Sequence, residues 1–182
     1  MSADQQAMLP EVRNMANGRG AGDGAHQAAG RLAGALRSMA VISRVDGAAL
    51  MLAAEPSGLR AVGGSTREGL TLQYAQQLVQ AGPALDAVSA GHPVAVDDLD
   101  GHPDRPGYAR LALTAAPVRA VLAVPVHVGG EVVGALNFYQ CTPCPWTSRQ
   151  IALGEHLAET TADLLVRLAA RPAAGDGAHG LP

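Results

Sequence analysis

The stretch AVPVHVGGEVVGALNFY, residues 123–139, decides the fold of this chain. Two runs rich in valine, 118–128 and 131–140, meet at the pair Gly129-Gly130. Two glycines between such runs are a strong signal of a two-residue β-hairpin turn, because glycine accepts the positive φ angles that the turn needs. The sequence therefore predicts an antiparallel hairpin here.

A long amphipathic helix is predicted directly after the hairpin, over residues 147–170. Thr147 and Gln150 have the spacing of a capping box, in which each side chain bonds to the backbone N–H of the other residue. A stripe of apolar and small residues is typical of a helix that covers one face of a sheet. Its predicted members are Ile151, Gly154, Leu157, Ala158, Thr161, Leu164, Leu165 and Leu168.

Upstream of the hairpin, the sequence predicts a series of strands and helices. Leu32, Leu36 and Met39 recur at helical spacing within a helix predicted near residues 26–42. The helix predicted over 70–80 has its stripe at Leu70, Tyr74, Gln77 and Leu78. The other predicted elements are a hairpin of 46–54 and 58–65, a helix at 83–91, a strand at 93–99, and a loop and short helix over 101–116.

The composition limits the partners that the chain can have. Its 182 residues carry a formal net charge of −3, with no lysine and no basic run for nucleic acid to bind. No apolar stretch reaches the roughly 20 residues of a membrane span, and the N-terminus lacks a signal-peptide core. Two cysteines are too few for a disulfide scaffold. We expect a cytoplasmic domain over 28–170 with disordered tails at 1–27 and 171–182, and neither a nucleic-acid nor a membrane partner.

Four stretches carry a resemblance to a known family: DGAALMLA at 46–53, AGPALDAVSAGHPVAVDDL at 81–99, VRAVLAVPVHVGGEVVGALNFY at 118–139, and the closing helix. In this order they resemble the GAF domain, a sensor module related to the PAS fold, over about residues 28–170. The chain is most similar in type to actinobacterial GAF modules that are fused to an ANTAR output domain. It ends about a dozen residues after the last helix, so we expect neither that domain nor its RNA-binding role.

The resemblance implies an α+β fold with a central antiparallel sheet of about five to six strands. The N- and C-terminal helices would cover one face, and the shorter helices and loops would cover the other, where the family holds its ligand pocket. The implied function is that of a stand-alone sensory domain that binds an unidentified small ligand and signals through protein contacts, with a separate output protein as one such partner. The alternative is an interaction module without a ligand, and a redox- or haem-sensing GAF domain is a further alternative.

Five residues come from segments that the resemblance places at or near the ligand cavity: Leu78, His92, Tyr108, Arg119 and Leu122. Arg119 is the only charged residue between Arg110 and Glu131, so an anionic ligand would meet it first. The alternative is a solvent-facing arginine at the start of the strand. Which face of strand 118–128 points inward stays open, because a shift of one residue exchanges the two faces.

Cys141 and Cys144, in YQCTPCPWTSRQ at 139–150, have the spacing of redox and zinc sites. The helix is expected to begin only at Thr147, so its N-terminus would not lower the pKa of either thiol. Two thiols also supply half of the four ligands that structural zinc usually takes. We interpret the stretch as a turn with incidental thiols, and a redox pair and a metal site remain as alternatives.

Other chemistries have less support in the sequence. The cyclic-nucleotide pattern of GAF domains is missing, and so are the mid-domain cysteines of the methionine-sulfoxide-reducing and bilin-binding types; we therefore expect no enzymatic activity. His92 and His102 could reach a haem, but both lie in GHP triplets that favour surface turns. The acidic stretch DDLDGHPDRP at 97–106 could bind a hard cation, but a solvated loop is favoured and no metal is predicted.

The terminal helices are expected to form a dimer interface. The stripe of helix 147–170 is wide enough to serve the sheet on one side and a partner helix on the other. We therefore predict a two-fold homodimer through a four-helix bundle of residues near 28–42 and 147–170. The alternative is a monomer whose sheet absorbs the stripe. The expected interface residues are Leu32, Leu36, Ile151, Leu157, Leu164 and Leu168.

Overall fold

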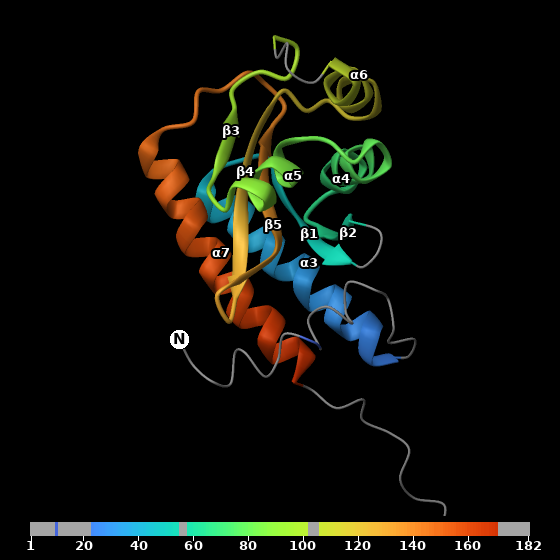
Figure 1. Cartoon of the computed structure of the whole chain (residues 1–182), viewed down its shortest axis with the longest axis vertical. Helices are drawn as coiled ribbons and strands as arrows, with labels where there is room; N and C mark the ends of the chain where they lie inside the picture. The colour runs from blue at the N-terminus through green and yellow to red at the C-terminus, as the bar shows by residue number, and fades with distance from the viewer. Residues whose placement is uncertain (1–9, 11–22, 55–57, 102–105, 171–182) are drawn as a thin grey trace, which may run out of the picture.

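Five antiparallel strands form one sheet in the order β2-β1-β5-β4-β3 (Figure 1). The computed structural model describes residue 10 and residues 23–54, 58–101 and 106–170. The predicted α+β fold with a central antiparallel sheet is confirmed. The strands are β1 (Gly47–Ala54), β2 (Gly58–Gly64), β3 (Val94–Val96), β4 (Ala120–Val128) and β5 (Glu131–Gln140).

The hairpin of β4 and β5 forms where the sequence predicts it. Val128 pairs with Glu131 across the turn, and Gly129 and Gly130 have φ angles of 60° and 87°. A side chain at either position would be strained in this left-handed region, which explains why both turn residues are glycine. β5 also pairs with β1, so the hairpin lies at the centre of the sheet.

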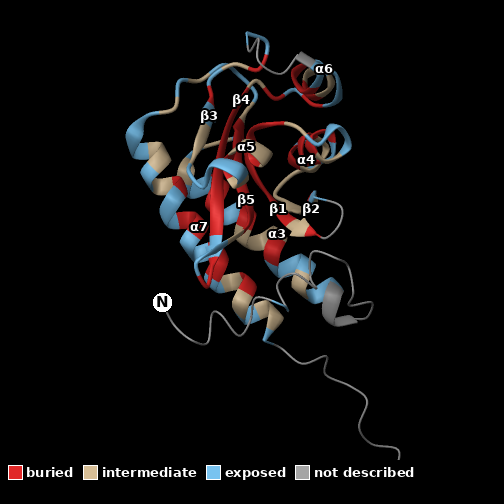
Figure 2. Cartoon of the chain, viewed as in Figure 1, coloured by how far each residue is buried: buried red, intermediate tan, exposed pale blue. Residues whose placement is uncertain are grey.

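Helices cover both faces of the sheet (Figures 1 and 2). α3 (Asp23–Ser43) and α7 (Ser148–Ala169) pack on one face, over a core that includes Leu36, Leu50, Leu122, Phe138 and Leu165. The second face carries α4 (Arg67–Val79), α5 (Pro83–Ala90) and α6 (Pro106–Ala115). This division of the helices agrees with the expectation from the sequence.

The start of α7 is the predicted capping box. The Thr147 hydroxyl accepts a hydrogen bond from the Gln150 N–H at 3.3 Å, and the Gln150 side-chain oxygen accepts one from the Thr147 N–H at 3.0 Å. Of the predicted stripe, five members are buried: Gly154, Leu157, Ala158, Thr161 and Leu165. The three others, Ile151, Leu164 and Leu168, are only half-buried.

Two predictions about the second face are wrong. The predicted stripe of α4 is not its buried face: Tyr74 and Leu78 are 55% and 77% exposed. Apart from Leu72, the inward side chains are small or carry amides, because the helix packs closely at Gly69 and its glutamines make buried hydrogen bonds. β3 has three residues rather than the expected seven, since the chain after Val96 turns into a loop that bonds to Arg119. The buried face of α4 consists of Gly69, Leu72, Gln73, Ala75 and Gln76.

The described residues bear on one end of the predicted domain. α3 begins at Asp23, before the predicted boundary at residue 28. The predicted tails otherwise lie almost wholly outside the described residues.

Candidate functional site

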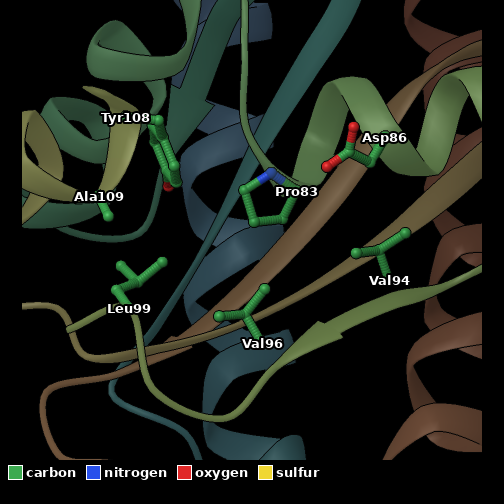
Figure 3. A pocket seen from close by; sticks show the side chains of 7 residues that line it. All are labelled: Pro83, Asp86, Val94, Val96, Leu99, Tyr108 and Ala109. Carbon is green, nitrogen blue, oxygen red and sulfur yellow. The ribbon is translucent and has the colours of Figure 1, made fainter. Parts of the chain in front are cut away.

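A small pocket lies between α5, β3 and α6, on the face of the sheet away from α3 and α7 (Figure 3). Its volume is about 50 Å³, which is room for a few water-sized groups. Most of the lining is apolar, and the polar groups come from one carboxylate and one phenol. The lining residues are Pro83 and Asp86 of α5, Val94 and Val96 of β3, Leu99 of the following loop, and Tyr108 and Ala109 of α6.

A buried glutamine of α4 positions the helix that forms one wall of the pocket. The Gln76 side-chain oxygen accepts a hydrogen bond from the Ala84 N–H at 2.8 Å, near the start of α5. Pro83 at the first turn has no N–H to satisfy, and Gly91 ends the helix with φ 71°. Pro83 and Gly91 are the sequence signals that predicted the two ends of α5. The role of Gln76 was not predicted, because a glutamine in a helix is usually expected at the surface.

Tyr108 is the predicted contact residue that lines the pocket. Its side chain is 3% exposed and packs in a cluster with Leu72, Val121 and Tyr139. Its hydroxyl group has no hydrogen-bond partner among the described residues. Burial raises the pKa of Tyr108 far above its usual value, so the phenol stays protonated and can both donate and accept.

Arg119, which was expected either to meet an anionic ligand or to face solvent, does not line the pocket and forms a part-buried ion pair. Its Nε and a terminal nitrogen each lie 2.8 Å from a carboxylate oxygen of Asp98, and Asp100 lies 3.5 Å away. The hydrogen bonds from Arg119 lower the pKa of Asp98, and Asp98 in turn raises the pKa of Arg119. The pairing holds loop 97–100 beside the start of β4, while Asp97 and Asp100 in this part of the acidic stretch are exposed.

The three other predicted contacts do not line the pocket. Leu122 packs on the opposite face, where its side chain and Val124 meet Gly154 of α7. Val121 points toward the second face instead, which is the one-residue alternative that the sequence left open. Leu78 is exposed on α4, and exposed His92 has its Nδ1 3.1 Å from the Pro93 carbonyl.

The pocket wall is bonded directly to the segment that leads into α7. The Asp97 carbonyl accepts a hydrogen bond from the Cys144 N–H at 2.9 Å, and its carboxylate accepts one from the Trp146 N–H at 3.2 Å. The Trp146 indole N–H donates to the Val96 carbonyl at 3.2 Å. A displacement of the end of β3 would therefore either carry the linker 141–147 with it or break these hydrogen bonds. The sequence gives no signal for these contacts, because most of them use backbone atoms.

The two cysteines lie in a turn before α7, as predicted. Both are free; Cys141 is exposed and Cys144 is half-buried. Burial and the neighbouring Asp46 carboxylate raise the pKa of Cys141, and Asp46 also accepts a hydrogen bond from the Cys141 N–H at 2.6 Å. Within the described part of the chain, no group of three or more histidine, cysteine or acidic residues is arranged to hold a metal ion. His102 lies outside the described residues.

The sheet order and the helices on its two faces agree with a family model. The model of the GAF domain matches residues 25–165. The chain belongs to the GAF family. GAF domains are a family of sensory modules, so a sensory class of function follows at this coarse level. No curated protein matches the sequence of this GAF domain.

Solved structures resemble this GAF domain in fold. The GAF domain of an Acinetobacter phosphoenolpyruvate-protein phosphotransferase is 14% identical with a TM-score of 0.57, covering 96% of this chain and 100% of that one. A type II free methionine-R-sulfoxide reductase from Thermoplasma acidophilum is 15% identical with a TM-score of 0.58, covering 80% and 97%. The blue-light absorbing form of the PixJ GAF domain from Thermosynechococcus elongatus is 17% identical with a TM-score of 0.56, covering 80% and 88%.

None of the helices in the described ranges is both long and apolar enough to cross a membrane.

Proposed function

We propose that this GAF domain is a cytoplasmic sensor that binds a small molecule in the pocket between α5, β3 and α6. The observation that carries the proposal is the Tyr108 hydroxyl, which is buried at the pocket without a partner among the described residues. Leaving a buried polar group unpaired costs about 1–3 kcal/mol. A ligand that bonds to this hydroxyl would recover that cost, so binding rather than catalysis is the proposed role.

The proposed signal travels from the pocket wall to α7. Val96 and Leu99 line the pocket, and Asp97 between them bonds to the backbone of Cys144 and Trp146. A ligand that displaces this wall would shift the start of α7. The shift would then be read by a partner protein that contacts the terminal helices, either a second copy of the chain or a separate output protein.

A second candidate function is dimerisation without a ligand, which the small volume of the pocket favours. Val41 and Ile42 near the end of α3 are 77% and 59% exposed, and such apolar side chains are suited to a contact with another helix. Leu32, Leu36 and Leu157 of the expected interface are buried in the domain's own core, which leaves Ile151, Leu164 and Leu168 for a partner.

Native mass spectrometry of the purified full chain tests the ligand proposal. We expect a small molecule to remain bound to the wild type and to be lost from Ala109→Leu, because the larger side chain would fill the pocket. Ala115→Leu is the matched control, since Ala115 is exposed at the end of the same helix. Equal retention in wild type and Ala109→Leu would contradict this site. A ligand-free wild type that dimerises would favour the second candidate.

A further inference from the structure

The pocket between α5, β3 and α6 is lined by two polar side chains of different kinds. The Tyr108 hydroxyl is buried without a hydrogen-bond partner among the described residues, and the Asp86 carboxylate is half-buried. In the view of Figure 3, Tyr108 and Asp86 lie on opposite sides of Pro83. Because the volume of the pocket is only about 50 Å³, one small molecule could contact both groups.

The start of α5 is a poor site for an anionic ligand. The N-terminus of a helix ordinarily attracts anions through its unpaired N–H groups. Pro83 has no N–H, and the Ala84 N–H donates to the Gln76 side chain at 2.8 Å. The Asp86 N–H donates to the Gly82 carbonyl at 3.1 Å. The carboxylate of Asp86 also places a negative charge in the first turn of this helix, where it would repel an anion.

The charges around the pocket are mainly negative. Between Pro83 and Arg119 the sequence has five aspartates, three arginines and no other residue that is charged at neutral pH, with histidine neutral. The Arg119 guanidinium does not line the pocket, and it lies 2.8 Å from an oxygen of Asp98 and 3.5 Å from one of Asp100. The described residues that line the pocket include no basic side chain. A field of this sign attracts cations and repels anions.

A neutral ligand and a metal ion both suit this lining less well than an organic cation. A neutral ligand that closed the pocket would remove water from the Asp86 carboxylate without supplying a counter-charge, which is costly. A hard metal ion takes about six oxygen ligands, whereas the described lining has side-chain oxygens only from Asp86 and Tyr108. The rest of the lining is apolar and suits a hydrocarbon group: Pro83, Val94, Val96, Leu99 and Ala109.

We propose that the pocket binds a small organic ammonium ion, with the charged nitrogen at Asp86 and a short hydrocarbon part against the apolar lining. A primary ammonium group has three N–H donors, and a carboxylate has about four acceptor positions. Asp86 can therefore accept from the ligand beside any contact that it makes within the protein. The Tyr108 hydroxyl can accept a further N–H, and the face of its ring attracts cations. This inference rests on the proposed function and specifies the class of ligand.

Titration of the ¹⁵N-labelled full chain with propylammonium tests the ligand class. Propionate and 1-propanol have a similar size and serve as the anionic and neutral controls, all at the same ionic strength. Up to about 100 mM, a range suited to the weak affinity of so small a probe, we expect a response to propylammonium alone. The response is a shift of the backbone signals of Val96, Leu99 and Ala109, which line the pocket.

Two variants test the groups that would hold the ammonium ion, and the ¹⁵N spectrum of each variant checks that it is folded. Asp86→Asn keeps the size of the side chain and removes its charge, so propylammonium should bind about tenfold more weakly. Asp163→Asn removes the same charge from an exposed position of α7 and should keep wild-type affinity. Tyr108→Phe should weaken binding about fivefold, the effect of one hydrogen bond, and should leave the Tm of the ligand-free protein unchanged because the lost hydroxyl is unpaired.

Four outcomes would overturn the inference. If propionate or 1-propanol shifts the lining signals as strongly as propylammonium does, the ligand class is wrong but the pocket stands. If folded Asp86→Asn binds propylammonium as tightly as the wild type does, Asp86 does not hold the ion. If propylammonium shifts only the signals of the exposed residues Asp97 and Asp100, it binds the acidic loop without specificity. If no probe shifts any of these signals, the pocket does not take ammonium ions, and the mass-spectrometric test of the proposed function remains independent of that result.

Discussion

Arg119 and Asp98 illustrate how a single pair of side chains can hold a loop in place. Because the hydrogen bonds from Arg119 lower the pKa of Asp98, the folded protein holds the carboxylate ionised to a lower pH than the unfolded chain does. The pair therefore contributes stability that is fully present above about pH 5 and is lost as the pH falls through the unfolded value near 3.9 toward the lower folded value.

We predict that Asp98→Asn lowers the Tm most near neutral pH, and that its difference from the wild type shrinks between about pH 6 and pH 3. Thermal unfolding at a series of pH values measures this difference. Asp163→Asn, at an exposed position of α7, is the control and should leave the Tm close to that of the wild type. A difference for Asp98→Asn that is constant across the whole range would refute the electrostatic explanation.

The two thiols are predicted to be dispensable for stability. Cys141 is exposed, and the hydrogen bonds that the two cysteines make to other elements come from their backbone N–H groups rather than from their thiols. Changing both cysteines to serine should alter the free energy of unfolding by no more than about 0.5 kcal/mol. Urea denaturation of the double variant beside the wild type measures this change. A loss of several kcal/mol, or stoichiometric zinc in the wild type, would make the pair structural.

The sequence predicted single residues less well than elements. Tyr108 was placed at the pocket by resemblance, but its unpaired hydroxyl depends on what surrounds it in three dimensions. Leu122 was misplaced because the two faces of β4 are equally apolar, so alternation gave no sign of which face was inward. The ion pair of Arg119 was not predicted, because its partner Asp98 lies 21 residues earlier in the chain.

At the scale of elements, α7 and the central hairpin could be predicted because their signals are local. Thr147 and Gln150 contact each other, and Gly129 and Gly130 determine their own turn. α4 could not be oriented in this way, since Tyr74 and Leu78 face outward and its buried face includes Gln76, which bonds to α5.

Gly154 offers a test of how closely α7 packs on the sheet. A Cβ atom there would lie 3.1 Å from Val124, 3.3 Å from Leu122 and 3.4 Å from Phe138. We predict that Gly154→Leu lowers the free energy of unfolding by about 1–3 kcal/mol, because the extra atoms cannot fit without displacing the helix. Ala152→Leu is the matched control at an exposed position of the same helix, and it should change stability little. Equal stabilities of the two variants in urea denaturation would contradict the packing described here.

For the whole molecule, the predicted assembly is a homodimer through α3 and α7. Leu164 and Leu168 are half-buried on α7, so a charge at either position should break the dimer without unfolding the monomer. Analytical ultracentrifugation should find a dimer for the wild type at tens of micromolar, and monomers for Leu164→Asp and Leu168→Asp. Arg167→Asp, at an exposed neighbouring position, controls for added negative charge. A monomeric wild type would exclude the bundle, and intact, folded dimers of both leucine variants would locate the interface elsewhere.

Trp146 gives this domain an optical consequence, because it is the only tryptophan in the chain. Its indole N–H is bonded to the carbonyl of Val96, a residue that also lines the pocket. Indole emission depends on hydrogen bonding and solvent contact, so a change at the pocket wall should alter the intrinsic fluorescence directly. A small molecule bound in the pocket should therefore shift the emission of the wild type, and Asp97→Ala should reduce that shift by loosening the contact to Trp146. The unlabelled protein would then report the occupancy of its pocket in a fluorescence plate reader. Libraries of candidate ligands could be screened by the shift in tryptophan emission.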